Sequence, residues 1–77
     1  MTREQLVTML WRFAGEPQAD ATIEFTDAGT VSYWAIDAMK WAVSIGLIEG
    51  YTDGSVRPRA TATRAEVATM IRRYMLN

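Results

Sequence analysis

The chain has 77 residues, neither cysteine nor histidine, and a formal net charge of −1. Without these two residue types it has no disulfide, no zinc finger, no histidine-based nucleophile and few of the ligands that transition metals need. Because no paired acid and base can be named either, we expect no metal site, no cofactor and no catalysis. Its length suits one small domain or one unit of a larger repeat, and no apolar run approaches the roughly 20 residues that cross a bilayer, so we expect no membrane insertion.

The first predicted helix covers residues 2–14. Thr2 and Gln5 have the spacing of a capping box, in which the two side chains bond free backbone amides at a helix start. Gly15 and Pro17 then end the helix. Its apolar side chains recur at the three- and four-residue spacing of one helical face, and they are Leu6, Val7, Leu10, Trp11 and Phe13.

Residues 16–32 show no periodicity and predict an irregular connection. Because such a connection is long for a small domain, we expect it to pack on the core through Ile23, Phe25 and Val31. The connection would then be an ordered part of the fold rather than a flexible linker.

The second predicted helix runs from about Tyr33 to Ile45, and Gly46 is placed to close it in the left-handed conformation. Its broad apolar face favours contacts on two sides. Trp34 and Trp41 lie on this face, a pattern typical of a core but also suited to stacking on sugar rings. We expect Trp41 in the core and treat Trp34, near the helix start, as a candidate sugar contact.

The stretch after this helix contains Asp53-Gly54, a strong signal for a tight turn. The turn could join two very short extended pieces into a β-ribbon, and Arg57-Pro58 predicts extended backbone because a residue before proline avoids the helical region. A calcium loop is disfavoured, since the alternating carboxylates and closing glutamate of an EF-hand are missing. The third predicted helix begins at Thr63, again with a capping box, here to Glu66.

The first and third predicted helices match each other at a shift of 61 residues. The paired residues are Thr2-Arg3 and Thr63-Arg64, Gln5 and Glu66, Leu6 and Val67, Thr8-Met9-Leu10 and Thr69-Met70-Ile71, Arg12 and Arg73, and Phe13 and Tyr74. Two unrelated amphipathic helices would share the apolar positions by chance, but not the same Thr-Arg start and a second matched arginine. We therefore expect a tandem array with a period near sixty residues.

Six motifs follow one another along the chain: Phe25-Thr26-Asp27, Tyr33-Trp34-Ala35, Ala38 with Trp41-Ala42, the run from Gly46 to Gly54, Arg57-Pro58, and Thr63-Arg64-Ala65-Glu66. In this order they resemble the S-layer homology (SLH) domain of bacterial surface proteins. The resemblance implies an all-α fold, a small three-helix unit with long ordered loops and room for one very short β-ribbon. It divides the chain into the closing helix of a preceding repeat (1–15), a connector (16–24) and a complete repeat (25–77).

The resemblance also implies a function. SLH domains are non-catalytic anchors that hold exported proteins on the cell wall by binding secondary cell-wall polysaccharide, often pyruvylated. Their grooves lie between adjacent repeats, and the arginine of the Thr-Arg-Ala-Glu motif is important for binding, which names Arg64 first and Arg3 second here. Trp34 and Asp53-Gly54 are further candidate glycan contacts, and the caps of the two helix starts are Thr63, Glu66, Thr2 and Gln5. We expect an extracellular location at the cell wall or S-layer, with the signal peptide outside this chain.

Two interpretations of Arg64 stay open. An arginine in the first turn of a helix gains nothing from the helix dipole, which favours anions there. A carboxylate of a pyruvylated glycan would fit between this guanidinium and the free amides of the helix start. Otherwise Arg64 pairs with Asp27, Asp53 or a backbone carbonyl group and orders the loop.

The charge of the chain is unevenly distributed. Residues 1–54 carry three basic and eight acidic side chains, whereas residues 55–77 carry five basic and one acidic. An isolated unit would expose faces that meet neighbouring repeats, so we expect self-association as a dimer or trimer.

A protein–protein assembly module without glycan binding is the main alternative. A helix-turn-helix DNA binder is opposed by the acidic first part and by roughly 16 residues between the second and third helices, so we expect no nucleic acid partner.

Overall fold

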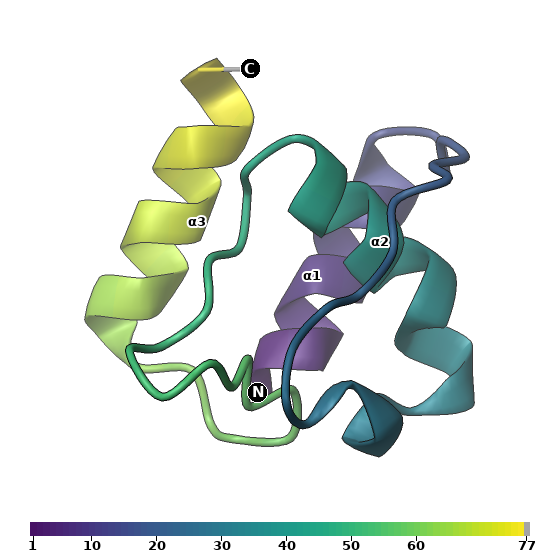
Figure 1. Ribbon diagram of the computed structural model, residues 1–77. Coiled ribbons are helices and arrows are strands. Elements are labelled where there is room, and N and C mark those ends of the chain that lie inside the picture. The colour runs from purple at the N-terminus through teal and green to yellow at the C-terminus, as the bar shows by residue number, and fades with distance from the viewer. Residues whose placement is uncertain (77) are drawn as a thin grey trace.

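The computed structural model describes residues 1–76, and its regular secondary structure is helical (Figure 1). The elements are α1 (Arg3–Phe13), the 3₁₀ turns η1 (Ala28–Thr30) and η2 (Tyr33–Ala35), α2 (Ile36–Ser44) and α3 (Arg64–Leu76). No β-strand forms within residues 1–76, and the prediction of a small all-α three-helix unit is confirmed. In Figure 1, α3 stands to one side of the pair formed by α1 and α2.

Both predicted capping boxes are present. The Thr2 hydroxyl accepts a hydrogen bond from the Gln5 amide (3.2 Å), and the Gln5 side chain accepts one from the Thr2 amide (2.8 Å). Thr63 and Glu66 exchange the same two bonds, at 3.1 and 3.0 Å. Because each box satisfies amides at the helix start, α1 and α3 both begin at the residue after the threonine.

The second helix begins three residues later than the sequence predicts, because residues 33–35 form η2. Ser32 precedes this turn, but its side chain does not cap it. Its hydroxyl and amide groups instead donate to the carboxylate of Glu4 in α1, at 2.6 and 2.9 Å. At the other end of α2, Gly46 has a φ of 72°, as expected for a left-handed closing residue.

The core lies between α1, α2 and the segment that follows α2. Trp41 is buried in it, as predicted, and Ile23 and Phe25 of the long connection pack against it, also as predicted. Within the described part of α3, Met70 alone is buried. The buried apolar residues are Leu6, Val7, Leu10, Val31, Ala35, Ala38, Met39, Trp41, Ala42, Leu47, Ile48, Val56 and Met70.

The segment between α2 and α3 makes the predicted tight turn. Gly54 donates a backbone hydrogen bond to the carbonyl group of Tyr51 (2.9 Å) and has a φ of 81°. The Tyr51 amide donates to the carbonyl group of Ser55 (2.8 Å), but the pairing goes no further. The very short β-ribbon does not form, because the chain after the turn bonds to α1 instead.

The start of α1 docks on residues 56–62, and we call this contact the junction. It satisfies amides in the first turn of α1, which have no partner inside their own helix. Its backbone contacts are Arg3 N with Ala60 O (2.9 Å), Glu4 N with Pro58 O (2.8 Å), Ala62 N with Met1 O (3.0 Å) and an isolated β-bridge between Thr2 and Thr61.

The prediction of extended backbone at Arg57 is wrong, since its φ is 49°, in the left-handed region. The carboxylate of Asp27 accepts hydrogen bonds from the amides of Val56 and Arg57, both at 2.8 Å. This bidentate contact ties the long connection to the junction segment and holds Arg57 in a conformation that Pro58 disfavours.

Candidate functional site

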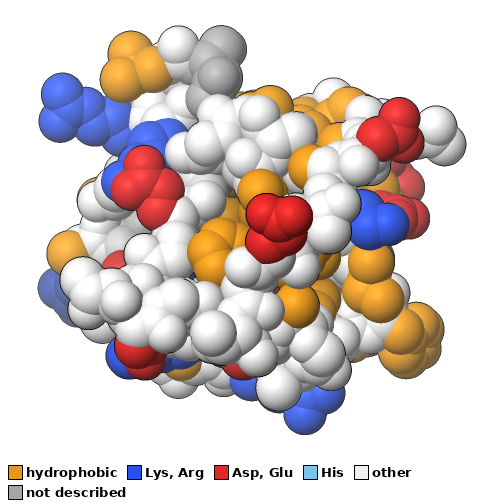
Figure 2. Space-filling model, in the orientation of Figure 1, with side chains coloured by type: hydrophobic (Ala, Val, Ile, Leu, Met, Phe, Trp, Pro, Cys, Tyr) orange, Lys and Arg blue, Asp and Glu red, His pale blue; other side chains and the backbone are white. Residues whose placement is uncertain are grey.

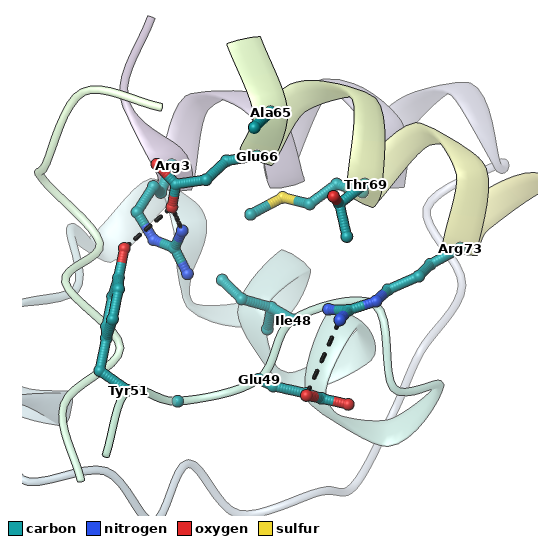
Figure 3. Close-up of a pocket in the computed structure, with 10 residues that line it drawn as sticks. Arg3, Ile48, Glu49, Tyr51, Ala65, Glu66, Thr69 and Arg73 are labelled. Carbon is teal, nitrogen blue, oxygen red and sulfur yellow. Dashed lines mark hydrogen bonds and ion pairs between the residues drawn. The ribbon is translucent and has the colours of Figure 1, made fainter. Parts of the chain in front are cut away.

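A pocket of about 270 Å³ opens between the start of α1, the segment after α2 and one side of α3 (Figure 3). Ile48 and Met70 give it a buried apolar part, and charged side chains surround them. We call it the Arg3 pocket. Its lining residues are Arg3, Ile48, Glu49, Gly50, Tyr51, Ala65, Glu66, Thr69, Met70 and Arg73.

Arg3 enters the pocket from the first turn of α1, which the junction holds in place. Its Nε donates to the carbonyl oxygen of Val56 at 3.0 Å, and its Nη1 is paired with the carboxylate of Glu66. The guanidinium also lies over the ring of Tyr51, 4.9 Å from its centre, in a cation–π contact. Nη2 makes no hydrogen bond with any residue in the described chain, and it belongs to a side chain that lines the pocket.

Burial lowers the pKa of the Arg3 guanidinium, because desolvation disfavours its charged form. The ordinary pKa of arginine is so high that the group stays charged at neutral pH. Tyr51 opposes the shift. The same ring also carries the guanidinium of Arg57, 4.0 Å from its centre. The pocket therefore contains a permanent cation in partly dehydrated surroundings.

Glu66 joins three parts of the structure through one carboxylate. Oε1 accepts from the Thr63 amide and caps α3, while Oε2 is paired with Arg3 and accepts from the Tyr51 hydroxyl at 2.8 Å. The predicted helix cap is thus also the counter-ion of the pocket arginine.

Arg73 and Glu49 face each other on the opposite side of the pocket, with 3.7 Å between Nη2 and Oε2 (Figure 3). Glu49 is largely exposed, at 73%, and Arg73 is partly exposed, at 37%, so this long ion pair contributes little stability. Together with Arg3 and Glu66, the pocket presents two cations and two carboxylates. Such a lining can bind the hydroxyl groups of a sugar and a carboxylate attached to it. Within residues 1–76, acidic side chains do not gather in threes as a metal site would require.

Arg64 is the first residue of α3 but does not line the Arg3 pocket. Its side chain is exposed and makes no hydrogen bond or ion pair with any described residue. Asp27 binds backbone amides instead, and Asp53 binds Ser55 and Arg57. In this chain Arg64 therefore does not order the loop, and its role as a ligand contact stays a prediction.

Trp34 lies at a different place. Its side chain is 40% exposed, and it lines a separate hollow with Gln5, Thr8, Met9 and Arg12. This hollow lies on the exposed side of α1 rather than at the junction. If Trp34 contacts a glycan, as predicted, the contact would lie at this hollow and not at the Arg3 pocket.

Asp53 and Gly54 form the exposed tight turn, away from the Arg3 pocket. The Asp53 carboxylate accepts hydrogen bonds from the hydroxyl (2.6 Å) and amide (3.0 Å) groups of Ser55 and from Arg57 (3.3 Å). These hydrogen bonds, above all those from Ser55, lower the pKa of Asp53 to about 2. The structure thus brings together Arg3 and Glu66 but leaves Arg64, Trp34 and the turn outside the pocket.

The sequence pattern did not single out three residues of the pocket as site residues: Tyr51, Glu49 and Arg73. Tyr51 lies inside the Gly-Tyr-Thr-Asp-Gly motif, and Arg73 is the second arginine matched by the internal repeat. These two signals could have identified them. Glu49 carries no comparable signal.

The profile of the S-layer homology domain matches residues 24–68 of this chain. The chain is similar to Cell surface glycoprotein 1 of Acetivibrio thermocellus, at 43% identity over 44 residues, which are 57% of this chain and 2% of that protein. It is also similar to an Endoglucanase of Bacillus sp. strain KSM-635, at 32% identity over 76 residues, 92% of this chain and 8% of that protein. The chain thus spans a small fraction of either relative. No solved structure matches it.

The profile match covers more than half of the chain and includes the motifs from Phe25 to Glu66 that carry the resemblance. Within residues 1–76, no helix is long and apolar enough to span a membrane. The Arg3 pocket is built partly from matched residues and partly from Arg3, Thr69, Met70 and Arg73, which lie outside the match. The chain therefore belongs to the S-layer homology domain family, whose members are non-catalytic modules that anchor proteins at the cell surface.

Proposed function

We propose that this chain anchors a larger protein to a bacterial cell wall by binding secondary cell-wall polysaccharide, and that it is not itself catalytic. The observation that carries the proposal is the Arg3 pocket, where a buried arginine keeps one nitrogen, Nη2, without a hydrogen-bond partner among the described residues. One of the two relatives supports a location at the cell surface. Cell surface glycoprotein 1 is named for the cell surface, and the match to the endoglucanase covers only 8% of that protein's length.

The chemistry of the pocket suits an acidic sugar such as a pyruvylated one. Its carboxylate would bind Arg3 Nη2 and the guanidinium of Arg73, because forked arginine donors match the two oxygens of a carboxylate. Glu49, released from Arg73, would accept hydrogen bonds from sugar hydroxyl groups, and the Thr69 hydroxyl would donate a hydrogen bond to another sugar oxygen. The Arg73–Glu49 pair is long, at 3.7 Å, and its carboxylate is 73% exposed, so exchanging it for a ligand costs little.

Residues outside the pocket belong to the proposal as separate contacts. Arg64, Trp34 and Asp53-Gly54 would meet other parts of an extended polymer rather than the sugar held at Arg3. The proposed organisation is a closing helix of a preceding repeat (1–15), a connector (16–24) and a complete repeat (25–77). In that organisation the Arg3 pocket lies between two repeats, with Arg3 supplied by the first.

Sedimentation of the chain with purified bacterial cell walls tests the proposal. We expect binding to untreated walls and loss of binding after acid extraction of the wall polymer. Arg73→Ala should weaken binding at least about tenfold, the usual effect of losing a hydrogen bond to a charged group. Arg72→Ala is the matched control, since Arg72 is exposed and does not line the pocket.

Equal binding by the Arg73→Ala and Arg72→Ala variants would contradict the assignment of the pocket. Arg64→Ala, measured beside them, reports whether the exposed arginine contributes a second contact. Circular dichroism of each variant separates loss of binding from loss of fold.

An assembly module that binds no glycan is the second candidate function, and one surface feature favours it. An apolar groove of about 430 Å³ runs between α1 and α3, and Figure 2 shows hydrophobic side chains at the surface beside the C-terminal end of α3. Exposed apolar patches mark protein contacts. The groove is lined by Met9, Leu10, Phe13, Ile71, Tyr74 and Met75. Binding to acid-extracted walls that is insensitive to Arg73→Ala would favour this candidate.

A further inference from the structure

Tyr51 is fixed at the edge of the Arg3 pocket by both its backbone and its side chain. Its amide donates to the carbonyl group of Ser55 (2.8 Å), and its own carbonyl group accepts from the amide of Gly54 (2.9 Å). Its hydroxyl donates to Oε2 of Glu66 at 2.8 Å (Figure 3). The fold therefore sets the position of this ring without help from a ligand.

The ring of Tyr51 carries two guanidinium groups. The group of Arg3 lies 4.9 Å from the ring centre and that of Arg57 lies 4.0 Å from it. Arg57 is itself held by Asp53, which pairs with its Nη2 at 3.3 Å, and by Asp27, which accepts from its amide at 2.8 Å. The negative face of an aromatic ring attracts cations, and more strongly where water is partly excluded.

Arg3, Glu66 and Tyr51 form a closed set of three contacts. Arg3 pairs with Oε2 of Glu66, the same oxygen accepts from the Tyr51 hydroxyl, and the Tyr51 ring carries the Arg3 guanidinium. No member of such a set can turn away without losing two contacts. Because a guanidinium is planar and rigid, fixing Nε, Nη1 and the group against the ring also fixes the direction of Nη2.

We infer that Tyr51 is a positioning residue for ligand binding: its ring keeps the Arg3 guanidinium in the orientation that leaves Nη2 for an acidic sugar. Tyr51 acts through Arg3 rather than by touching the ligand, because its hydroxyl is engaged by Glu66 and its ring by two arginines. The part of this inference that concerns the sugar rests on the proposed function, whereas the orientation of Arg3 requires no ligand.

Hydrogen exchange at Nε of Arg3, measured by NMR in the ligand-free chain, tests the orientation. Tyr51→Leu should make this exchange about threefold faster or more, because the cation–π contact is lost. Rates are compared with those of backbone amides of α2 in the same samples, which corrects for a change in global stability. Tyr33→Leu is the matched control, since Tyr33 is 88% exposed and lies outside the pocket. Unchanged exchange in Tyr51→Leu would overturn the inference.

Tyr51→Phe is the second variant, and it removes only the hydroxyl. It keeps the ring, so it should restore most of the protection of Arg3 Nε that Tyr51→Leu loses. It also keeps the apolar volume of the side chain, so it tests the inference independently of whether Tyr51→Leu folds. Fast exchange at Arg3 in Tyr51→Phe would show that the hydroxyl, and not the ring, orients the guanidinium.

Sedimentation with purified bacterial cell walls tests the consequence for binding. Tyr51→Leu should weaken binding about tenfold, and Tyr51→Phe should restore most of it. In a chain that already carries Arg3→Ala, Tyr51→Leu should weaken binding no further, because nothing is left to position. A further loss there would show that Tyr51 touches the ligand itself and would overturn the inference. If the unchanged chain binds no walls, the proposed function fails, while the exchange rates at Arg3 still test the positioning role.

Discussion

Arg3 carries its charge at a place where only 6% of its side chain is exposed. A buried charge is costly unless it is paired and hydrogen-bonded. Glu66, the Val56 carbonyl group and the Tyr51 ring supply this compensation, and they come from two segments that are far from Arg3 in sequence. The arginine therefore stabilises the junction first, and it offers a ligand only its remaining nitrogen.

Replacing Arg3 by alanine should lower the free energy of unfolding by about 3 kcal/mol. This is the low end for a buried pair, because the partner Glu66 is 24% exposed and regains some hydration. Urea denaturation measures the change. Arg12→Ala, on the exposed face of the same helix, should cost less than about 1 kcal/mol. Equal losses for the two variants would show that the pair contributes nothing beyond a surface charge.

Asp53 provides a pH-dependent contact in the tight turn. Its pKa of about 2 lies below the ordinary 3.8, because Ser55 hydrogen-bonds the charged form. Because the folded-state pKa is lowered, the charged carboxylate stabilises the turn fully above about pH 4. That contribution is lost as the pH falls from about 4 through 2. The carboxyl carbon of Asp53, titrated by NMR, should show this midpoint.

Ser55→Ala should move the pKa of Asp53 back toward 3.8, since the hydroxyl donor is gone. Thr52→Ala is the control, because Thr52 is exposed and bonds no described residue. A midpoint that Ser55→Ala does not move would show that the hydrogen bond is not its cause.

At the scale of elements, local sequence signals predicted the helix ends well. The capping boxes at Thr2 and Thr63 and the left-handed glycine Gly46 depend on residues within one turn. A local sequence pattern therefore includes every residue that determines them. The start of α2 and the backbone of Arg57 depend on distant carboxylates. Glu4 accepts a hydrogen bond from the hydroxyl group of Ser32, which precedes η2 and α2, and Asp27 accepts one from the amide of Arg57. No local pattern contains these partners.

The candidate site was predicted in part for the same reason. The internal repeat and the Thr-Arg-Ala-Glu motif predicted Arg3 as a ligand contact and Glu66 as a helix cap. A motif on a helix does not, however, predict which segment of the chain packs against that helix. The pocket needs α1, residues 48–51 and α3 together, so Tyr51 and Arg73 became site residues only through tertiary packing. Arg64, equivalent to Arg3 in sequence, lacks that packing within residues 1–76.

Gly50 shows how tightly the segment after α2 is packed. A Cβ atom there would lie 2.5 Å from Cε1 of Phe25 and 3.2 Å from the carbonyl oxygen of Ser55. Because ring and backbone would both have to move, Gly50→Ala should lower the free energy of unfolding by about 1–3 kcal/mol. Gly29→Ala, where nothing lies within 4 Å, should stay within about 0.5 kcal/mol. Thermal or urea unfolding that gives equal stabilities would contradict the crowding.

At the scale of the whole molecule, charged and apolar surfaces are separated. The Arg3 pocket joins the start of α1 to the inner side of α3, whereas the apolar groove follows the other ends of the same two helices. Hydrophobic side chains reach the surface there beside the C-terminal end of α3 (Figure 2). A glycan in the pocket and a protein in the groove could therefore bind at the same time.

The apolar groove should make the isolated chain self-associate, and a second copy is its expected occupant because each copy presents both a groove and a projecting aromatic ring. Phe13 is 81% exposed and Met75 75%, more than a monomer normally leaves in contact with water beside an apolar cavity. Phe13→Ser should weaken association at least about tenfold in sedimentation equilibrium, as loss of an anchoring aromatic residue does at interfaces. Tyr33→Ser is the matched control, since Tyr33 is 88% exposed but lies outside the groove. A compact monomer at millimolar concentration, or equal effects of the two variants, would show that the groove is not a contact between copies.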